Sequence, residues 1–140
     1  MDCLYFSTPS GTIYRTVYDT WDRVISQWVG TNDTGATHAN PAGSGSTNNK
    51  FKTTSYEYDN GGGGDNNLTR VVLYPDSNTS NQRVTDLAYD WRARLVAMKD
   101  GVESSESTSV NRPITFRTLN NLGQTTSISV FDGDGVRSES

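Results

Sequence analysis

Short runs of alternating polar and β-branched or aromatic residues dominate the chain. Such runs cover residues 12–29, 52–74, 83–99 and 114–131, and each is interrupted by a polar or glycine-containing turn. Alternation with a period of two around a central turn predicts a β-hairpin. No window keeps apolar residues at i, i+3, i+4 and i+7 over three turns, so long helices are not expected. The sequence therefore predicts an all-β protein built from consecutive antiparallel hairpins.

The hairpins resemble one another at their turns. Each first strand ends on Tyr-Asp or a close equivalent, and each return strand opens on a basic or amide residue. The residues of this motif are Tyr18, Asp19, Arg23, Tyr58, Asp59, Arg70, Tyr89, Asp90, Arg94, Asn120, Gly123 and Gln124. Successive Asp/Asn positions are 40, 31 and 30 residues apart. A period in this range indicates a repeat architecture, which builds a surface or wall before it builds an active site.

The spacing within each turn has a physical explanation. An Asp or Asn at a strand end accepts a hydrogen bond from the backbone two residues on, and a residue with positive φ is wanted shortly afterwards. Gly123 suits that position and Asp22 tolerates it, whereas Ala93 fits badly and predicts another geometry for the third turn. The return-strand arginine is expected to lie near the Asp and to pair with it. In the second copy, Asp59 and Arg70 are eleven positions apart instead of four, which predicts a seven-residue insertion.

Composition marks the segments outside the hairpins. Three loops rich in Gly, Ser, Thr, Asn or Glu are expected to be flexible, and the first has no apolar anchor. These loops are residues 31–50, 61–67 and 101–112. Residues 1–11 and 136–140 are expected to be terminal tails, which leaves residues 12–135 as the repeat region.

The bulk composition fits a lean but folded β protein. Leu, Ile, Val and Phe make up 26 of the 140 residues, and the net charge of −4 is too small for a typical disordered chain. The 14 aromatic residues supply further apolar area. Basic residues are scattered, so a nucleic-acid partner is not expected. No apolar run approaches the length of a membrane span, and no secretory signal peptide is visible at the start.

The recurring pattern aromatic-Asp-x-x-Gly-Arg-hydrophobic, in a β chain rich in Gly, Asn and Thr, resembles the YD repeats of bacterial RHS proteins. Teneurins and the B/C components of insecticidal toxin complexes are related to that family. The matching segments are residues 18–24, 56–71, 89–95 and 119–125. No copy keeps Tyr, Asp, Gly and Arg together, and the family's terminal core signature is not found. In the family, hairpins wind side by side into a spiral sheet that closes as a hollow shell, so the resemblance implies an open β-shell fragment.

The resemblance implies a structural function. The chain would be a segment of a secreted or cell-surface repeat protein whose shell encloses or presents a toxin or effector. Its partners would be the rest of a larger shell, or further copies of the chain through open sheet edges. The alternative is an adhesin-like module that binds glycan or protein. Trp21 and Trp91 are expected at hairpin tips, where an aromatic ring either stacks on a sugar or packs on the adjacent repeat.

Candidate catalytic and metal-binding residues are sparse. The single histidine, His38, lies in a Gly/Ser/Asn-rich loop without a nucleophile motif, so neither an enzyme nor a cofactor is expected. The Gly61–Gly64 run lacks the Lys-Ser/Thr pair of a phosphate-binding loop. Asp132 and Asp134 form the one metal-like cluster, which is either a turn or a loose Ca²⁺ site.

Overall fold

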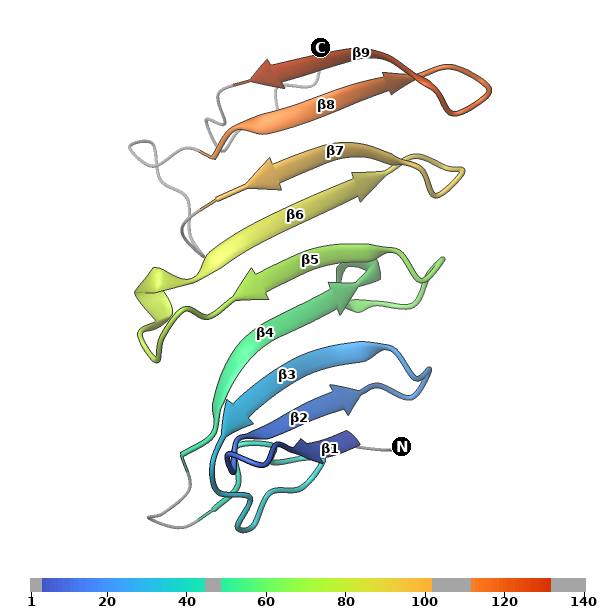
Figure 1. The fold of residues 1–140 in the computed structure, drawn as a ribbon. Helices are drawn as coiled ribbons and strands as arrows, with labels where there is room; N and C mark the ends of the chain where they lie inside the picture. The colour runs from blue at the N-terminus through green and yellow to red at the C-terminus, as the bar shows by residue number, and fades with distance from the viewer. Residues whose placement is uncertain (1–3, 45–48, 102–111, 132–140) are drawn as a thin grey trace. The chain divides into compact units, whose positions relative to one another are not determined.

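The computed structural model describes residues 4–44, 49–101 and 112–131. Its strands are β1 (Leu4–Ser7), β2 (Ile13–Tyr18), β3 (Val24–Gly30), β4 (Phe51–Tyr58), β5 (Leu68–Leu73), β6 (Arg83–Tyr89), β7 (Leu95–Asp100), β8 (Ile114–Leu119) and β9 (Thr125–Phe131). Two single-turn 3₁₀ helices, η1 (Asp59–Gly61) and η2 (Thr79–Asn81), complete the described elements. Consecutive strands pair antiparallel in chain order in an open sheet (Figure 1). The predicted all-β hairpin fold is confirmed.

The prediction of a tail over residues 1–11 was wrong, because β1 lies within it. β1 pairs antiparallel with β2 from Leu4 opposite Thr16 to Ser7 opposite Ile13. Tyr and Phe, both strong β-formers, make up the middle of this short strand. The C-terminal tail over residues 136–140 and nearly all of the loop over residues 101–112 lie outside the described residues.

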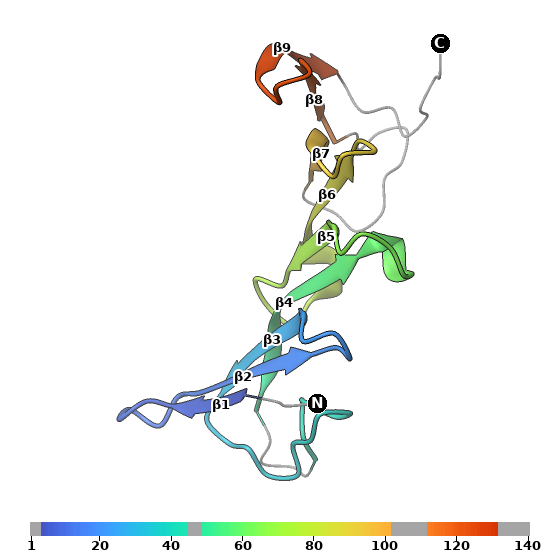
Figure 2. The ribbon, with the colours of Figure 1, turned by 90° about the vertical axis from the view of Figure 1, so that its right-hand side faces the viewer.

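Contacts divide the chain into two compact units, Met1–Tyr56 with Leu73–Ser77 and Glu57–Val72 with Asn78–Ser140. The strands of each unit form a single layer (Figures 1 and 2). Few apolar side chains are therefore buried among the described residues: Ile13 and Val17 in the first unit, and Val84 in the second. Within the described part of the chain, no helix is long and apolar enough to cross a membrane.

In the first unit, the loop between β3 and β4 is anchored by an ion cluster. Arg15 lies between Ile13 and Val17 on the buried face of β2. Its Nη2 donates to Oδ2 of Asp33 at 2.7 Å, and Lys50 Nζ, whose side chain is fully buried, pairs with Oδ1 of the same carboxylate. The loop has no large apolar residue to anchor it, and these ion pairs anchor it instead. The described part of the loop is held to the sheet at Asp33.

In the second unit, a carboxylate again lies between two cations. Asp86 on β6 accepts Nε of Arg70 at 2.6 Å and Nη2 of Arg112 at 2.8 Å. Arg112 is buried and also donates to the carbonyl of Val84 at 2.9 Å. Gly101 leaves room for this arginine, because a Cβ there would lie 1.4 Å from the Arg112 Cδ. Charged pairs therefore hold the described part of the β3–β4 loop in the first unit and Arg112, just before β8, in the second.

We predict that Asp33→Asn reduces the loss of unfolding free energy that accompanies a fall in pH. Burial raises the pKa of Asp33, but hydrogen bonds and charge from Lys50 and Arg15 outweigh it and hold that pKa below its ordinary value of 3.8. A folded-state pKa below the unfolded value stabilises the fold fully above about pH 3.8, and the contribution is lost as the pH falls through the lowered pKa. The variant should be less stable at pH 7 by on the order of 2–3 kcal/mol, since Lys50 and Arg15 lose their anion.

Chemical unfolding between pH 7 and pH 2 checks this expectation. Asp65→Asn on the exposed glycine-rich tip is the matched control, and it should reproduce the wild-type profile. Equal acid dependence in wild type and Asp33→Asn would contradict the role given to this carboxylate.

Candidate functional site

The β2–β3 hairpin ends in a turn closed by Asp19. The Asp19 N–H donates to the Arg23 carbonyl at 2.9 Å, and the Asp22 N–H donates to the Asp19 carbonyl at 3.2 Å. Oδ1 of Asp19 accepts the backbone N–H groups of Trp21 at 2.8 Å and Arg23 at 3.0 Å, while Oδ2 accepts Nε of Arg23 at 2.7 Å. One carboxylate thus satisfies two backbone donors and one cation, as expected for a closing Asx turn.

The same turn recurs in the β6–β7 and β8–β9 hairpins. Oδ1 of Asp90 accepts the N–H two residues on at 2.9 Å and that of Arg94 at 3.1 Å, and Oδ2 accepts Nε of Arg94 at 2.8 Å. Oδ1 of Asn120 accepts the corresponding backbone groups at 2.9 and 3.0 Å, and its Nδ2 donates to Oε1 of Gln124 at 2.9 Å. An amide pair therefore replaces the ion pair without changing the geometry.

The arginines and backbone donors also set the charge state of the turns. In Asp90, the hydrogen bond from Arg94 is the main cause that holds the pKa below its ordinary value. In Asp19, burial raises the pKa, but the hydrogen bonds from Arg23 and Trp21 outweigh this effect, so the pKa lies below its ordinary value. Both carboxylates are consequently kept as acceptors and are poorly suited to donate a proton in general acid chemistry.

Ala93 adopts the same left-handed conformation as its counterparts, so the prediction of another geometry for this turn was wrong. Its φ is 56°, compared with 60° at Asp22 and 81° at Gly123. Its N–H donates to the Asp90 carbonyl at 2.9 Å, as that of Gly123 does to Asn120 at 3.0 Å. The Asx hydrogen bonds and the strand ladder over-determine the turn. These bonds hold Ala93 in the left-handed conformation, which costs an alanine about 1–2 kcal/mol.

The aromatic position of the motif is the last residue of its strand. Tyr18, Tyr58 and Tyr89 end β2, β4 and β6 and are half-buried, while Leu119 ends β8. In the three hairpins with four-residue spacing, the register shifts by one residue immediately before this position. Such a bulge increases the local twist and leads the strand into its turn.

The β4–β5 turn closes on Asn67 and not on Arg70. The Asp59 N–H donates to the Asn67 carbonyl at 2.9 Å, and the Asn67 N–H donates to Asp59 Oδ1 at 3.0 Å. The same two hydrogen bonds, one to a backbone carbonyl and one to the Asp or Asn side-chain oxygen, close the other turns. β5 begins one residue later, at Leu68, as the other return strands do. Asp59 and Asn67 are eight positions apart instead of four, so the insertion has four residues. The prediction of seven was wrong.

Arg70 lies within β5 and pairs with Asp86 of β6, so it is not the closing residue of its own turn. Arg70 is the first arginine after Asp59 and fits the sequence motif, but the amide residue Asn67 fits it as well and lies at the closing position. The longer tip accommodates left-handed residues at Asn60, Gly61 and Asn66. The position of the first strand residue after the turn was the signal that could have placed the motif correctly.

A further turn of this type, which the sequence motif does not include, joins β1 to β2. The Thr8 N–H donates to the Thr12 carbonyl and the Gly11 N–H to the Thr8 carbonyl, both at 2.9 Å, and Gly11 has a φ of 80°. The hydroxyl of Thr8 accepts the Thr12 N–H at 3.2 Å. Threonine here replaces the carboxylate, since a hydroxyl makes the same local bond more weakly. The Pro-Ser-Gly sequence that follows Thr8 is a turn signal in its own right.

In the second unit, neighbouring turns are joined by arginine. Nη1 of Arg94 donates to the carbonyl of Asn120 at 2.8 Å, and Nη1 of Arg92 donates to that of Asn121 at 3.2 Å. The closing arginine of one turn therefore also holds the next turn. A single guanidinium performs both tasks because it presents several N–H donors in one plane.

Trp21 and Trp91 lie at hairpin tips and remain exposed, at 61% and 83% of their surface. The guanidinium of Arg23 lies 4.6 Å from the ring centroid of Trp21, and that of Arg92 lies 4.5 Å from Trp91. Within the second unit, the neighbouring described hairpin leaves most of the Trp91 ring uncovered. Leu122 at the β8–β9 tip is exposed to 84%, so large apolar tip residues recur.

The described residues contain little that suggests catalysis or metal binding. His38 is half-buried, and its Nδ1 has no hydrogen-bond partner among the described residues. Among those residues, no group of three or more His, Cys, Asp and Glu side chains is arranged to hold a metal ion. The Ca²⁺ candidates Asp132 and Asp134 lie outside the described residues.

We predict that Ala93→Gly stabilises the chain by about 1 kcal/mol, because glycine removes the left-handed strain at a smaller cost in unfolded-state entropy. The reciprocal change Gly123→Ala should destabilise it by about the same amount. A Cβ at Gly123 would have open space around it, so the cost there is conformational. Urea unfolding measures both. Ala97→Gly in the middle of β7 is the control and should destabilise; if Ala93→Gly destabilised as much, the strain would be disproved.

Comparisons with known proteins complete the description of these turns. Scans of protein-family models, of curated proteins and of solved structures give no match to this chain. The basis for a function is therefore the geometry of the turns and faces together with the sequence motif that they carry.

Proposed function

We propose that the chain is a structural segment of a YD-repeat protein, a stretch of β-wall in a secreted or cell-surface shell that encloses or presents a toxin or effector. The observation that carries the proposal is the recurrence of one Asx-closed turn at Asp19, Asp90 and Asn120, with a longer variant at Asp59. A repeated turn of fixed geometry lets hairpins follow one another in register, which is the requirement for a continuous wall.

The use of charged groups supports a wall more than an enzyme. Asp19 and Asp90 are occupied in closing turns, and Asp33 and Asp86 are occupied in anchoring connectors. Catalytic carboxylates need a held position beside open space for substrate. These four side chains instead serve the backbone and the neighbouring cations.

The exposure of β9 supports association with further strands. All seven residues of this strand are exposed, and Ile128 and Val130 project apolar surface at 63% and 66% exposure. The strand carries neither a charge nor a proline, the usual devices that protect a sheet edge. Such an edge is suited to pairing with another strand.

We predict that the full chain gives a β-type far-ultraviolet circular dichroism spectrum and associates as its concentration rises. The double variant Ile128→Lys with Val130→Lys should shift association to at least roughly tenfold higher concentration, since charge at an edge opposes strand pairing. Sedimentation velocity measures this.

Leu122→Lys is the control, because Leu122 is also an exposed apolar residue, at 84%, but lies at a hairpin tip. It should leave association unchanged. A monomeric chain with a helical spectrum would reject the wall proposal.

The exposed tryptophans favour a second candidate, a glycan-binding adhesin module. Trp21 and Trp91 each present an exposed indole at a hairpin tip, with an arginine beside the ring. Exposed aromatic faces stack on sugar rings, and the adjacent guanidinium supplies hydrogen-bond donors for hydroxyl groups.

For this candidate, we predict binding on a glycan array that falls by roughly tenfold in Trp21→Ala or Trp91→Ala, the loss expected when one stacking contact of about 1.4 kcal/mol is removed. Leu122→Ala removes exposed apolar surface at a third tip without removing an aromatic ring, so it should bind as wild type does. The absence of any array signal from the wild-type chain would eliminate this candidate.

A further inference from the structure

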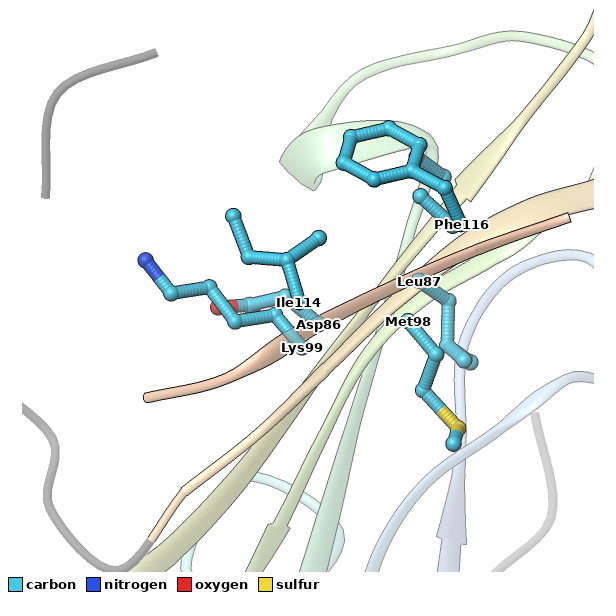
Figure 3. Close-up of a pocket in the computed structure, with 8 residues that line it drawn as sticks. Asp86, Leu87, Met98, Lys99, Ile114 and Phe116 are labelled. Carbon is cyan, nitrogen blue, oxygen red and sulfur yellow. The ribbon is translucent and has the colours of Figure 1, made fainter. Parts of the chain in front are cut away.

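One face of the second unit is hollowed across β6, β7 and β8. The hollow has a volume of about 190 Å³. Its side-chain lining comes from Asp86, Ala88, Ala97, Lys99, Ile114 and Phe116. Figure 3 shows Asp86, Lys99 and Ile114 on one side of the strands, with Leu87 and Met98 pointing to the other side. Leu87 and Met98 therefore line the hollow without projecting their side chains into it.

The strand register explains why a hollow forms here. Ala88 lies opposite Ala97, and Ala97 lies opposite Phe116, which places two methyl groups beside a large ring. The next row on the same face pairs Lys99 with Ile114. Short side chains between long ones leave a depression, because alternate residues of a strand share a face.

The walls of the hollow are apolar and partly fixed. Phe116 makes an edge-to-face contact with Phe131 of β9, with ring centroids 5.7 Å apart and planes at 78°. This geometry is the favoured one for an aromatic pair and holds the Phe116 ring in place. Ile114 supplies a second apolar wall, and the two alanines supply the floor. The hollow is suited to an apolar group.

The rim of the hollow is cationic, in contrast to the chain as a whole. Asp86 is held between Arg70 and Arg112, and Lys99 lies opposite it in the register. Three cations thus lie with two carboxylates, Asp86 and the Glu57 whose charge also acts on Arg70, in a chain whose net charge is −4. The Arg70 side chain is 47% exposed and uses its Nε for Asp86, so its guanidinium also faces solvent. A ligand that carries negative charge beside an apolar group matches this rim.

Size limits what can enter. Pockets for whole small-molecule ligands or cofactors measure about 300–1,000 Å³, and this hollow is smaller. We propose that it binds a partner polypeptide by taking up one aromatic or branched side chain that is flanked by carboxylates. This inference does not rest on the wall function, because it depends only on the face of β6, β7 and β8.

A set of matched peptides tests the proposal on the full chain. The probe is N-acetyl-Asp-Phe-Asp-amide, compared with N-acetyl-Asn-Phe-Asn-amide and N-acetyl-Asp-Gly-Asp-amide. Amide chemical shifts in ¹⁵N-labelled protein should move at Ala88, Ala97 and Phe116 with the acidic peptide. The neutral peptide should bind roughly threefold more weakly, as for the loss of one partly exposed ion pair. The glycine peptide should give no local shifts.

Variants separate the hollow from the rest of the sheet. Ala97→Leu fills the floor of the hollow and should abolish the chemical-shift changes. Arg70→Gln should lower the affinity for the acidic peptide to that for the neutral peptide. Met98→Leu is the control, since Met98 points to the opposite face, and it should bind as wild type does. Circular dichroism confirms that each variant folds. Unchanged binding in Ala97→Leu, equal binding of the acidic and neutral peptides, or tighter binding of decanoate than of the peptide would overturn the proposal.

Discussion

The described hairpins depend on the hydrogen bonds accepted by the Asp, Asn or Thr side-chain oxygen that follows the first strand of each hairpin. Because so few apolar residues are buried in the described part of the chain, strand register is poorly specified by a core, and a slip of one residue would exchange the two faces of a strand. Asp19 and Asp90 prevent such a slip by accepting two backbone N–H groups each. The turn therefore performs the task that core packing performs in a thicker fold.

A second consequence of the thin core is that connectors are held by charge. Asp33 and Asp86 each neutralise two cations, and Lys50 has no exposed side-chain surface. Removing one member of such a cluster leaves a buried charge without its partner, which is costly. Charge clusters of this kind define where a connector lies more sharply than non-directional apolar contact does, because hydrogen-bond geometry must also be met.

Strands β2 to β9 and the closing residues of three of the four predicted turns could be anticipated from the sequence, because alternation and Asx chemistry are local, whereas β1 was missed. Non-local features could not. The pairing of Asp33 with Arg15 depends on a loop returning to β2, and no spacing rule encodes it. Arg70 and Asn67 both fit the pattern of a basic or amide residue before a strand, and backbone closure, which selects Asn67, needs no particular side chain at that position. Ala93 was misjudged because local preference was weighed without the neighbouring bonds that override it.

The distribution of occupied and available groups points to where function resides. The turn carboxylates accept backbone N–H groups and the closing arginines, and Asp33 and Asp86 accept the cations beside them. What remains available is surface: exposed rings at tips, an uncharged edge on β9, and a hollow over Ala88 and Ala97 with a cationic rim. Each of these suits contact with another molecule more than bond-making chemistry.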